Sequence, residues 1–266
     1  MSVITISRGT FSGGKLLAER LSATLGYRCI DRDAIVNSAA VRGVSQKELV
    51  AALEKPPANS VATLNHRKYI YLAVVQAALA QEILSGRAIY HGHAGHLLLS
   101  GGISVLRLRV IAPIEFRIRM AQERLGLSRS ETVAYIQKAD ADRRRWTQYL
   151  YGVDWEDPSL YDLVLNLEHF GIETATRLVA GMIKEAGSDF LEEHPSAIGD
   201  FALASRVRGK LALKPLTSHL EVEVQSRSGA VTIKNTPFDD QEEVRNCVMG
   251  VPGVTALTYE EAAPAP

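Results

Sequence analysis

The sequence predicts an α/β protein in which a doubly wound parallel sheet with flanking helices is followed by a small α+β domain. Three observations lead to this prediction. Gly9, Gly14 and Lys15 have the spacing of a phosphate-binding P-loop. Short apolar segments then alternate with helical patterns up to about residue 187, which is typical of parallel βαβ units. Beyond that point the pattern changes to a helix, a hairpin, a second helix and a last strand.

The elements of the first part follow from apolar periodicity and from stop signals. Asp31 is placed to cap a helix, Ser45 and Ser128 begin capping-box patterns, and Gly26 and Gly86 end helices. Strands are expected at residues 2–7, 27–30, 88–90, 104–112 and 163–167. Helices are expected at 15–25, 31–40, 45–55, 64–84, from Pro113 onward, at 128–149 and at 173–185.

The second part is short enough to be a separate module. Leu220, Val222 and Val224 alternate on one face of a strand, and Ser228 with Gly229 makes the turn to the returning strand. The expected order is helix 198–211, strands 220–225 and 230–235, helix 239–249 and strand 254–259. We therefore expect domains at 1–187 and 197–260, and a disordered Ala/Pro-rich tail at 261–266.

Composition narrows the class of protein. The 266 residues are 46% hydrophobic, which is enough for a packed core. Lys and Arg together number 30, as do Asp and Glu, and this balance argues against a general nucleic-acid binder. Cys29 and Cys247 form no disulfide or zinc pattern. Neither a signal peptide nor a membrane span is visible, so a cytoplasmic protein is expected.

The loop that follows the first strand predicts nucleotide chemistry. Its backbone N–H groups and the N-terminus of the next helix would surround a phosphate, and Lys15 would place a mobile charge on the transferred phosphoryl group. Leu16 stands where Ser or Thr would ligate Mg²⁺. Ser12 is either a substitute ligand or a plain loop serine, and we favour the plain serine. The residues assigned to the cofactor are Gly9, Ser12, Gly13, Gly14 and Lys15.

Arg143, Arg144 and Arg145 lie on a polar helix where a nucleotide-kinase lid would fall. Arginine forks bind phosphate oxygens bidentately, and successive arginines point around most of the helix, so at least one should face the loop. The alternative is a solvated charged face with i,i+4 pairing such as Asp140–Arg144. The sequence leaves both interpretations open. On the first, Arg144 and Arg145 join Lys15 as catalytic residues, and Arg143 binds the substrate.

Two further segments follow strands and should lie at the mouth of the site. Asp31, Arg32 and Asp33 follow the second strand, where they would bind the acceptor, cap the next helix, or do both. The HGHAGH segment follows the third strand. Its histidine spacing matches no zinc pattern, so we expect no metal site and place His93 toward the ligand.

Residues 1 to about 187 resemble the cytidylate kinase-like family of P-loop proteins. The likeness rests on SRGTFSGGKLLAERLSATLGY, DRD, GHAGHLLL, VIAPIEFRIRM and DADRRRWTQYLYGVDWEDPSLYDLVLN. The resemblance implies a nucleoside monophosphate kinase fold and phosphoryl transfer from ATP, with Mg²⁺, to a nucleoside monophosphate such as CMP. It assigns the glycines and Lys15 to ATP, Asp31 and Asp33 to the acceptor side, and Arg143 to Arg145 to the lid. His93 stands where the family often has arginine.

Residues 197–260 resemble a BON domain through LEVEVQSRSGAVTIKN and VRNCVMGVPGVTALTYE. This likeness implies a binding or tethering module whose ligand is a phospholipid or a protein. Two functions stay open for the whole chain. The first is a nucleoside monophosphate kinase regulated or tethered by its C-terminal module. The second, favoured by Leu16 and His93, is a nucleotide-binding sensor without turnover. Nucleic acid is not an expected partner, and homo-oligomer formation is left open.

Overall fold

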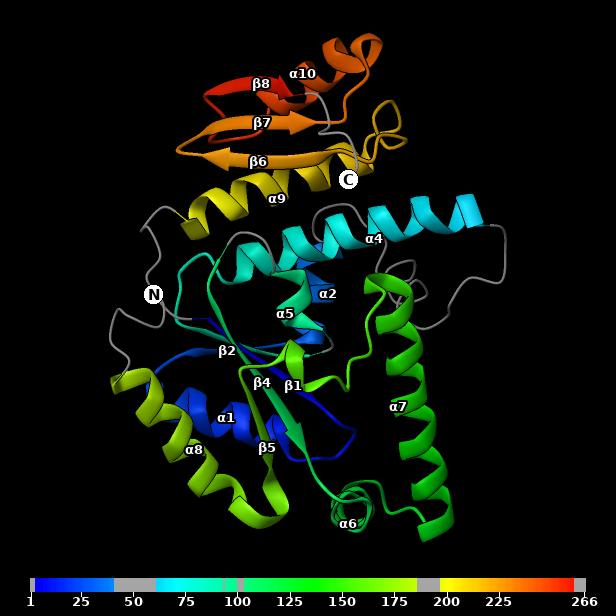
Figure 1. The fold of residues 1–266 in the computed structure, drawn as a ribbon, viewed down its shortest axis with the longest axis vertical. Coiled ribbons are helices and arrows are strands. Elements are labelled where there is room, and N and C mark those ends of the chain that lie inside the picture. Colours follow the sequence, from blue (N-terminus) through cyan, green and yellow to red (C-terminus); the bar gives the residue numbers. More distant parts are fainter. Residues whose placement is uncertain (1–2, 41–60, 93, 100–102, 186–196, 261–266) are drawn as a thin grey trace. The chain divides into compact units, whose positions relative to one another are not determined.

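The computed structural model describes residues 3–40, 61–92, 94–99, 103–185 and 197–260. His93, the helix expected at 45–55 and the tail at 261–266 lie outside these ranges. The chain divides into two compact units, made of residues 1–34, 85–100 and 104–192 and of residues 35–84, 101–103 and 193–266. Figure 1 labels the elements, and each unit is described by itself.

The first unit is built on a five-stranded parallel sheet, as the sequence predicted. Its strands are β1 (Val3–Arg8), β2 (Arg28–Asp31), β3 (Ala88–His91), β4 (Val105–Ile111) and β5 (Leu163–Asn166), in the order β2-β3-β1-β4-β5. The register places Val3 opposite both Ala88 and Val105, so β1 is central. Because all five strands run parallel, their carboxyl ends meet at one edge, where such sheets bind ligands.

Helices of this unit follow the predicted start and stop signals. They are α1 (Gly14–Leu25), α5 (Gly95–Leu98), α6 (Ile114–Leu125), α7 (Arg129–Tyr151), the 3₁₀ turn η1 (Pro158–Leu160) and α8 (Leu167–Glu185). Ser128 and Glu131 form the expected capping box at the start of α7. Helix α8 begins earlier than expected, because its two parts are joined across a kink at Gly171, where φ is 65°.

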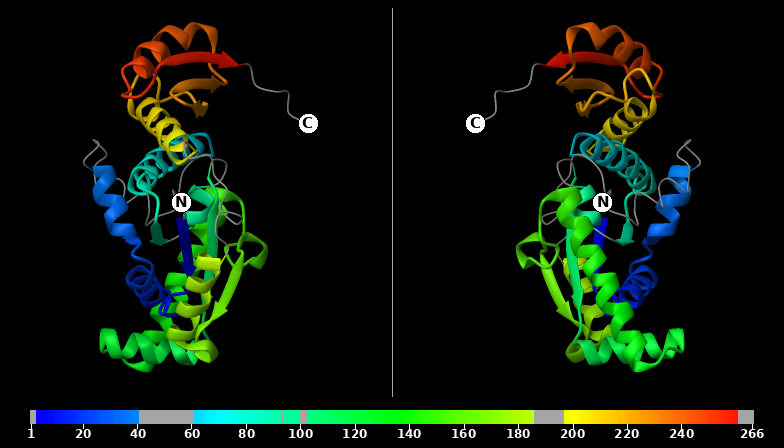
Figure 2. Two further views of the ribbon diagram at one scale, coloured as in Figure 1. Left: turned by 90° about the vertical axis from the view of Figure 1, so that its left-hand side faces the viewer. Right: turned by 90° about the vertical axis from the view of Figure 1, so that its right-hand side faces the viewer.

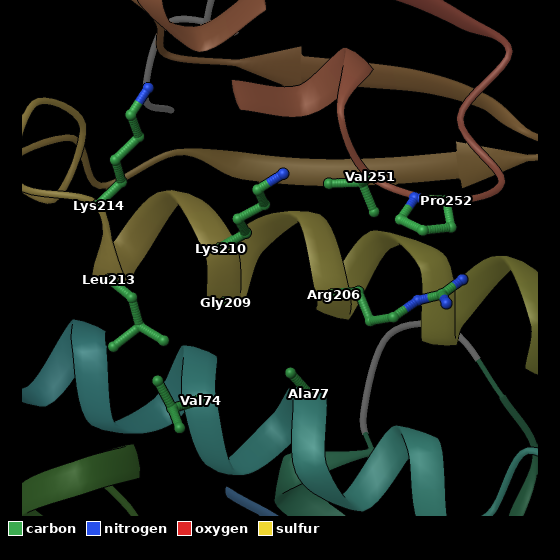
Figure 3. Close-up of a pocket in the computed structure, with 9 residues that line it drawn as sticks. All are labelled: Val74, Ala77, Arg206, Gly209, Lys210, Leu213, Lys214, Val251 and Pro252. Atoms are coloured by element: carbon green, nitrogen blue, oxygen red, sulfur yellow. The ribbon is translucent and has the colours of Figure 1, made fainter. Parts of the chain in front are cut away.

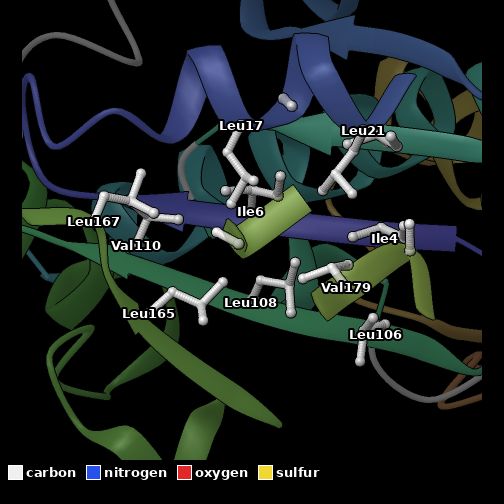
Figure 4. Packing of buried hydrophobic residues seen from close by; sticks show 14 residues of the cluster. Ile4, Ile6, Leu17, Leu21, Leu106, Leu108, Val110, Leu165, Leu167 and Val179 are labelled. Atoms are coloured by element: carbon white, nitrogen blue, oxygen red, sulfur yellow. The ribbon is translucent and has the colours of Figure 1, made fainter. Parts of the chain in front are cut away.

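The core of the first unit lies between the sheet and the pair α1 and α8 (Figure 4). Leu17 and Leu21 of α1 and Val179 of α8 meet the strand residues Ile6 and Leu108, and all five are fully buried or nearly so. Burying side chains of this size is worth roughly 1.5–3 kcal/mol each. This packing fixes the start of α1 against the end of β1, and thereby positions the phosphate-binding loop between them.

The second unit combines a small sheet with two long helices. Strands β6 (Glu223–Arg227), β7 (Ala230–Lys234) and β8 (Ala256–Glu260) form a sheet in that order, with β6–β7 antiparallel and β7–β8 parallel. The helical elements are α4 (Val61–Glu82), α9 (Ala197–Leu213), the 3₁₀ turn η2 (Phe238–Asp240) and α10 (Gln241–Met249). The expected helix–strand–strand–helix–strand order is therefore present. Helix α2 (Arg32–Ala40) begins in the first unit.

Helix α9 packs between the small sheet and α4, as Figure 2 shows. Val207 and Leu211 face the sheet core, whereas a Cβ at Gly209 would lie 3.1 Å from Ala77 of α4. This close packing explains why residues 35–84 group with the C-terminal elements, a division that differs from the domain ranges expected from the sequence. Among the described residues, no helix is long and apolar enough to cross a membrane.

Candidate nucleotide-binding site

The loop between β1 and α1 requires glycine at two consecutive positions. Gly13 has a φ of 92°, and a Cβ there would lie 2.8 Å from the Leu167 side chain. A Cβ at Gly14 would lie 2.7 Å from the Cβ of Arg8. Side chains at either position would displace neighbouring atoms, so the tight path of the loop depends on both residues. The loop therefore brings its backbone N–H groups and the start of α1 to the end of β1.

Ser12 holds this loop together from inside. Its hydroxyl lies 3.0 Å from the carbonyl oxygens of Gly9 and Val110, and the residue is 1% exposed. A hydroxyl already bonded to two buried carbonyls is poorly placed to bind a cation. The geometry agrees with the plain loop-serine interpretation, and neither Ser12 nor Gly9 is among the residues that line the adjoining cleft.

A cleft of about 930 Å³ opens beside the loop at the carboxyl edge of the sheet. It is large enough for a ligand of nucleotide size. The basic residues that line it are Arg8, Lys15, Arg32, Arg124 and Arg143. The acidic residues that line it are Glu19, Asp31, Asp33 and Glu123. The cleft thus joins the loop lysine to the segment after β2, as the order of strands requires.

The segment that follows β2 is anchored by its first carboxylate. Asp31 accepts a hydrogen bond of 2.8 Å from the backbone N–H of Ala34, which confirms the predicted helix cap. Arg32 and Asp33 are exposed side chains that also line the cleft. Lys15 lines the same cleft, where it forms a half-exposed ion pair with Glu19 at 3.7 Å.

Asp140 connects α7 to the loop. Its carboxylate accepts hydrogen bonds from the Thr10 backbone N–H at 3.0 Å, from the Thr10 hydroxyl at 2.7 Å and from Arg117. Arg143 adds an ion pair at 3.2 Å. Burial would raise the pKa of Asp140, but the hydrogen bonds from Arg117 and Thr10 outweigh it and lower the pKa below its ordinary value. The carboxylate is therefore charged near neutral pH.

Arg143 is the member of the arginine cluster that faces the cleft. Its guanidinium donates hydrogen bonds to the Thr10 hydroxyl and to Asp140. Burial, and next the neighbouring charge of Arg8, lower the pKa of Arg143 to about 10. Arg143 stays protonated at neutral pH, and it is a partly buried cation at the wall of the cleft.

Arg144 and Arg145 do not line the cleft. Arg144 is 54% exposed and pairs with Glu156, and Arg145 is 64% exposed and pairs with Asp142. The i,i+4 pair Asp140–Arg144, offered as the alternative for this cluster, is replaced by pairing of Asp140 with Arg117 and Arg143. The assignment of Arg144 and Arg145 as catalytic residues stays a prediction.

Three contributors to the site were not identified from the sequence. Arg8 precedes the loop directly, and its Nε is buried without a hydrogen-bond partner among the described residues. Burial lowers the pKa of Arg8. Arg124 comes from the end of α6, and Arg117 holds Thr10 through a 2.7 Å bond to its carbonyl oxygen. The position of Arg8 beside Gly9 was a usable signal, whereas nothing local distinguishes Arg117 or Arg124 from other helix arginines.

The donor set fits phosphate better than it fits a protein-held metal. Leu16 lines the cleft with an apolar side chain, and within the described ranges no three His, Cys, Asp or Glu residues are grouped as a metal site. His91 lies at the cleft, and burial followed by the charge of Arg8 lowers its pKa. Burial lowers the pKa of His96 to about 4. Any Mg²⁺ would therefore be held mainly by nucleotide phosphates and water.

A model of the cytidylate kinase-like family matches residues 3–169. The chain belongs to the cytidylate kinase-like family. It is 29% identical over 201 residues to a cytidylate kinase of Staphylothermus marinus, covering 73% of this chain and 100% of that relative. It is 31% identical over 168 residues to a cytidylate kinase of Methanothrix thermoacetophila, covering 62% of this chain and 87% of that relative.

A solved structure of an uncharacterized protein from Eubacterium ventriosum has the same fold. The likeness has a TM-score of 0.53 at 15% sequence identity and covers 69% of this chain and 99% of the other. The predicted α/β fold is thus confirmed, and the family is one of kinase-like nucleotide-binding proteins. The matched residues end at 169, so the BON-like assignment of residues 197–260 stays a prediction.

Proposed function

We propose that this protein is a nucleoside monophosphate kinase that transfers the γ-phosphoryl group of ATP to CMP or a closely similar acceptor. One observation carries the proposal: Lys15 of the phosphate loop, the segment of Asp31 and Asp33, and the partly buried Arg143 all line a single cleft. Phosphoryl transfer needs the two nucleotides aligned and their charge neutralised in one place. The curated relatives named cytidylate kinase support CMP as the acceptor.

In this proposal, each group of residues in the cleft has a role that follows from its position. The loop N–H groups and the start of α1 bind the donor phosphates. The ammonium group of Lys15 stays paired with the phosphoryl group while it is transferred. Arg8, Arg124 and Arg143 neutralise the charge that develops during transfer. Asp31 and Asp33 orient the acceptor. When bound, Mg²⁺ would neutralise charge between the β- and γ-phosphates, and Asp31, Asp33 or Glu19 could contact its water shell from the cleft wall.

The second candidate is a sensor that binds nucleotide without turnover. Leu16 favours it, because an isobutyl group offers no oxygen to the metal on which efficient transfer depends. In this case the residues 197–260 would be a BON-like module that carries the output. A sensor should show nucleotide-dependent hydrogen exchange in that module and no ADP formation.

A coupled assay separates the two candidates. The full chain is incubated with ATP, Mg²⁺ and a panel of nucleoside monophosphates, and ADP release is followed. We expect CMP to stimulate release at least tenfold over ATP alone, Lys15→Ala to abolish this, and the exposed Lys184→Ala to leave it unchanged. ATP binding by calorimetry with no stimulated release would instead establish the sensor. Absence of both binding and release would refute both.

A further inference from the structure

The second unit contains a cavity beside α9 with no assigned role. It has a volume of about 470 Å³, which is within the range of small-molecule sites. Its lining comes from three segments: α4, α9 and the turn after α10. Figure 3 shows Val74 and Ala77 directed from α4 toward α9, and Val251 and Pro252 at the opposite wall.

Apolar side chains form much of this lining. Val74, Ala77 and Val251 are each at most 6% exposed. Leu213 points from α9 toward Val74, as Figure 3 shows, and Pro252 completes the apolar wall. Gly209 has no side chain, and Ala77 packs close to it, because a Cβ at Gly209 would lie 3.1 Å from the Cβ of Ala77. Such a surface favours a ligand with an apolar body.

The charged residues of the lining all have the same sign. Arg206 and Lys210 lie four residues apart on α9, Lys214 directly follows the last residue of that helix, and none of the described residues that line the cavity is acidic. Like charges at this spacing destabilise an isolated helix. The pair of Arg206 and Lys210 therefore weakens α9 unless an anion lies beside it.

The protein supplies only part of that negative charge. Lys214 forms an ion pair with Glu243, and Lys210 donates to the carbonyl oxygen of Gly250 at 3.1 Å. Arg206 has no ion pair or hydrogen bond to any described residue, and its Nε is buried. The guanidinium end lies near the turn after α10, where a Cβ on Gly253 would be 3.7 Å from its Nη2. The planar guanidinium group of Arg206 can donate two parallel hydrogen bonds to a carboxylate or a phosphate.

We propose that this cavity binds a small amphipathic anion, in which a carboxylate or phosphate head contacts Arg206 and Lys210 and a single apolar chain covers Val74, Ala77 and Leu213. The site lies wholly within the second unit. It shares no residue with the nucleotide cleft. The proposal therefore does not rest on the proposed kinase activity, and binding is measured without nucleotide.

Calorimetry with the full chain tests the site. Monomeric dodecanoate and dodecyl phosphate represent the two kinds of head group. Dodecylamine and a neutral dodecyl glycoside test whether the negative charge is needed. Inorganic phosphate tests whether the alkyl chain of the ligand is needed. At least one of the two anions should bind with one-to-one stoichiometry and at least tenfold tighter than every control. Whichever of them binds more tightly identifies the head group.

Variants locate the binding. Arg206→Gln should weaken binding of the anion at least tenfold, and Lys210→Gln should weaken it several-fold. Leu213→Glu, at a position that is 38% exposed, should abolish binding while circular dichroism shows an unchanged fold. Arg245→Gln, an exposed change on α10 outside the cavity, should leave the dissociation constant within twofold. Equal binding of the amine or glycoside, an unaffected Arg206 variant, binding only to anionic vesicles, or no binding of either anion would each overturn the proposal.

Discussion

Replacement of Asp140 by asparagine removes a charge that holds the phosphate-binding loop to α7. The amide oxygen can still accept from Thr10, but the charge opposite Arg117 and Arg143 is lost. A hydrogen bond to a charged group contributes about 1 kcal/mol more than a neutral one, so two arginines give about 2 kcal/mol. Asp140 and Arg117 side chains are 19% and 14% exposed, so the loss should stay below the 3–5 kcal/mol typical of fully buried pairs.

Urea unfolding followed by tryptophan fluorescence measures this loss. The chain contains two tryptophans, Trp146 and Trp155, and both belong to the first unit, so the signal reports on the part that contains Asp140. We expect the unfolding midpoint to fall without a change of slope, since the exposed surface is unchanged. The matched control is Asp142→Asn on the same helix, whose exposed pair with Arg145 should contribute at most about 1 kcal/mol.

The pH dependence provides a second check. Because the folded-state pKa of Asp140 is lowered, its stabilisation is present above the unfolded-state value of about 3.9 and disappears as the pH falls through the folded value. The difference between wild type and variant should thus be constant from about pH 6 to 8 and shrink below about pH 4. A difference under about 0.5 kcal/mol at pH 7, or one that persists undiminished at pH 3, would refute the argument.

Three further changes test other parts of the first unit. Gly14→Ala places a Cβ 2.7 Å from the Cβ of Arg8 and should lower the free energy of unfolding of the unit by about 1–3 kcal/mol in the same urea assay. The same change should weaken the binding of ATP in calorimetry. Leu16→Ser adds the hydroxyl that Mg²⁺ prefers, so Mg²⁺ should strengthen ATP binding more than in wild type. Wild type should lose stability as the pH falls from about 6.5 to 4, because burial lowers the folded-state pKa of His96 to about 4. His96→Phe should make the loss of folding stability between about pH 6.5 and 4 smaller by on the order of 3 kcal/mol. If the variant lost as much stability as wild type, the lowered pKa of His96 would not be its cause.

Local signals predicted the strands and helix ends well, because they depend on short-range chemistry. The Asp31 cap and the Ser128–Glu131 box each involve residues three apart. Contacts across long sequence separations were missed. Thr10 and Asp140 are 130 positions apart, and their bond depends on how α7 packs, which no nearby pattern encodes. The same holds for α4, whose helical pattern was identified but whose packing against α9 was not.

The arrangement of the three arginines explains why only one of them is placed to take part in the proposed chemistry. Successive helix residues are about 100° apart, so three consecutive arginines cannot all face the loop, and only Arg143 lines the cleft. Partial burial of its side chain, and next the repulsion from Arg8, lower the pKa of Arg143. Asp140 offsets part of that positive charge, and a bound phosphate would offset the rest. Arg143 and Arg8 can thus pair with a phosphate without a metal, so the absence of a hydroxyl at Leu16 should affect phosphoryl transfer far more than nucleotide affinity.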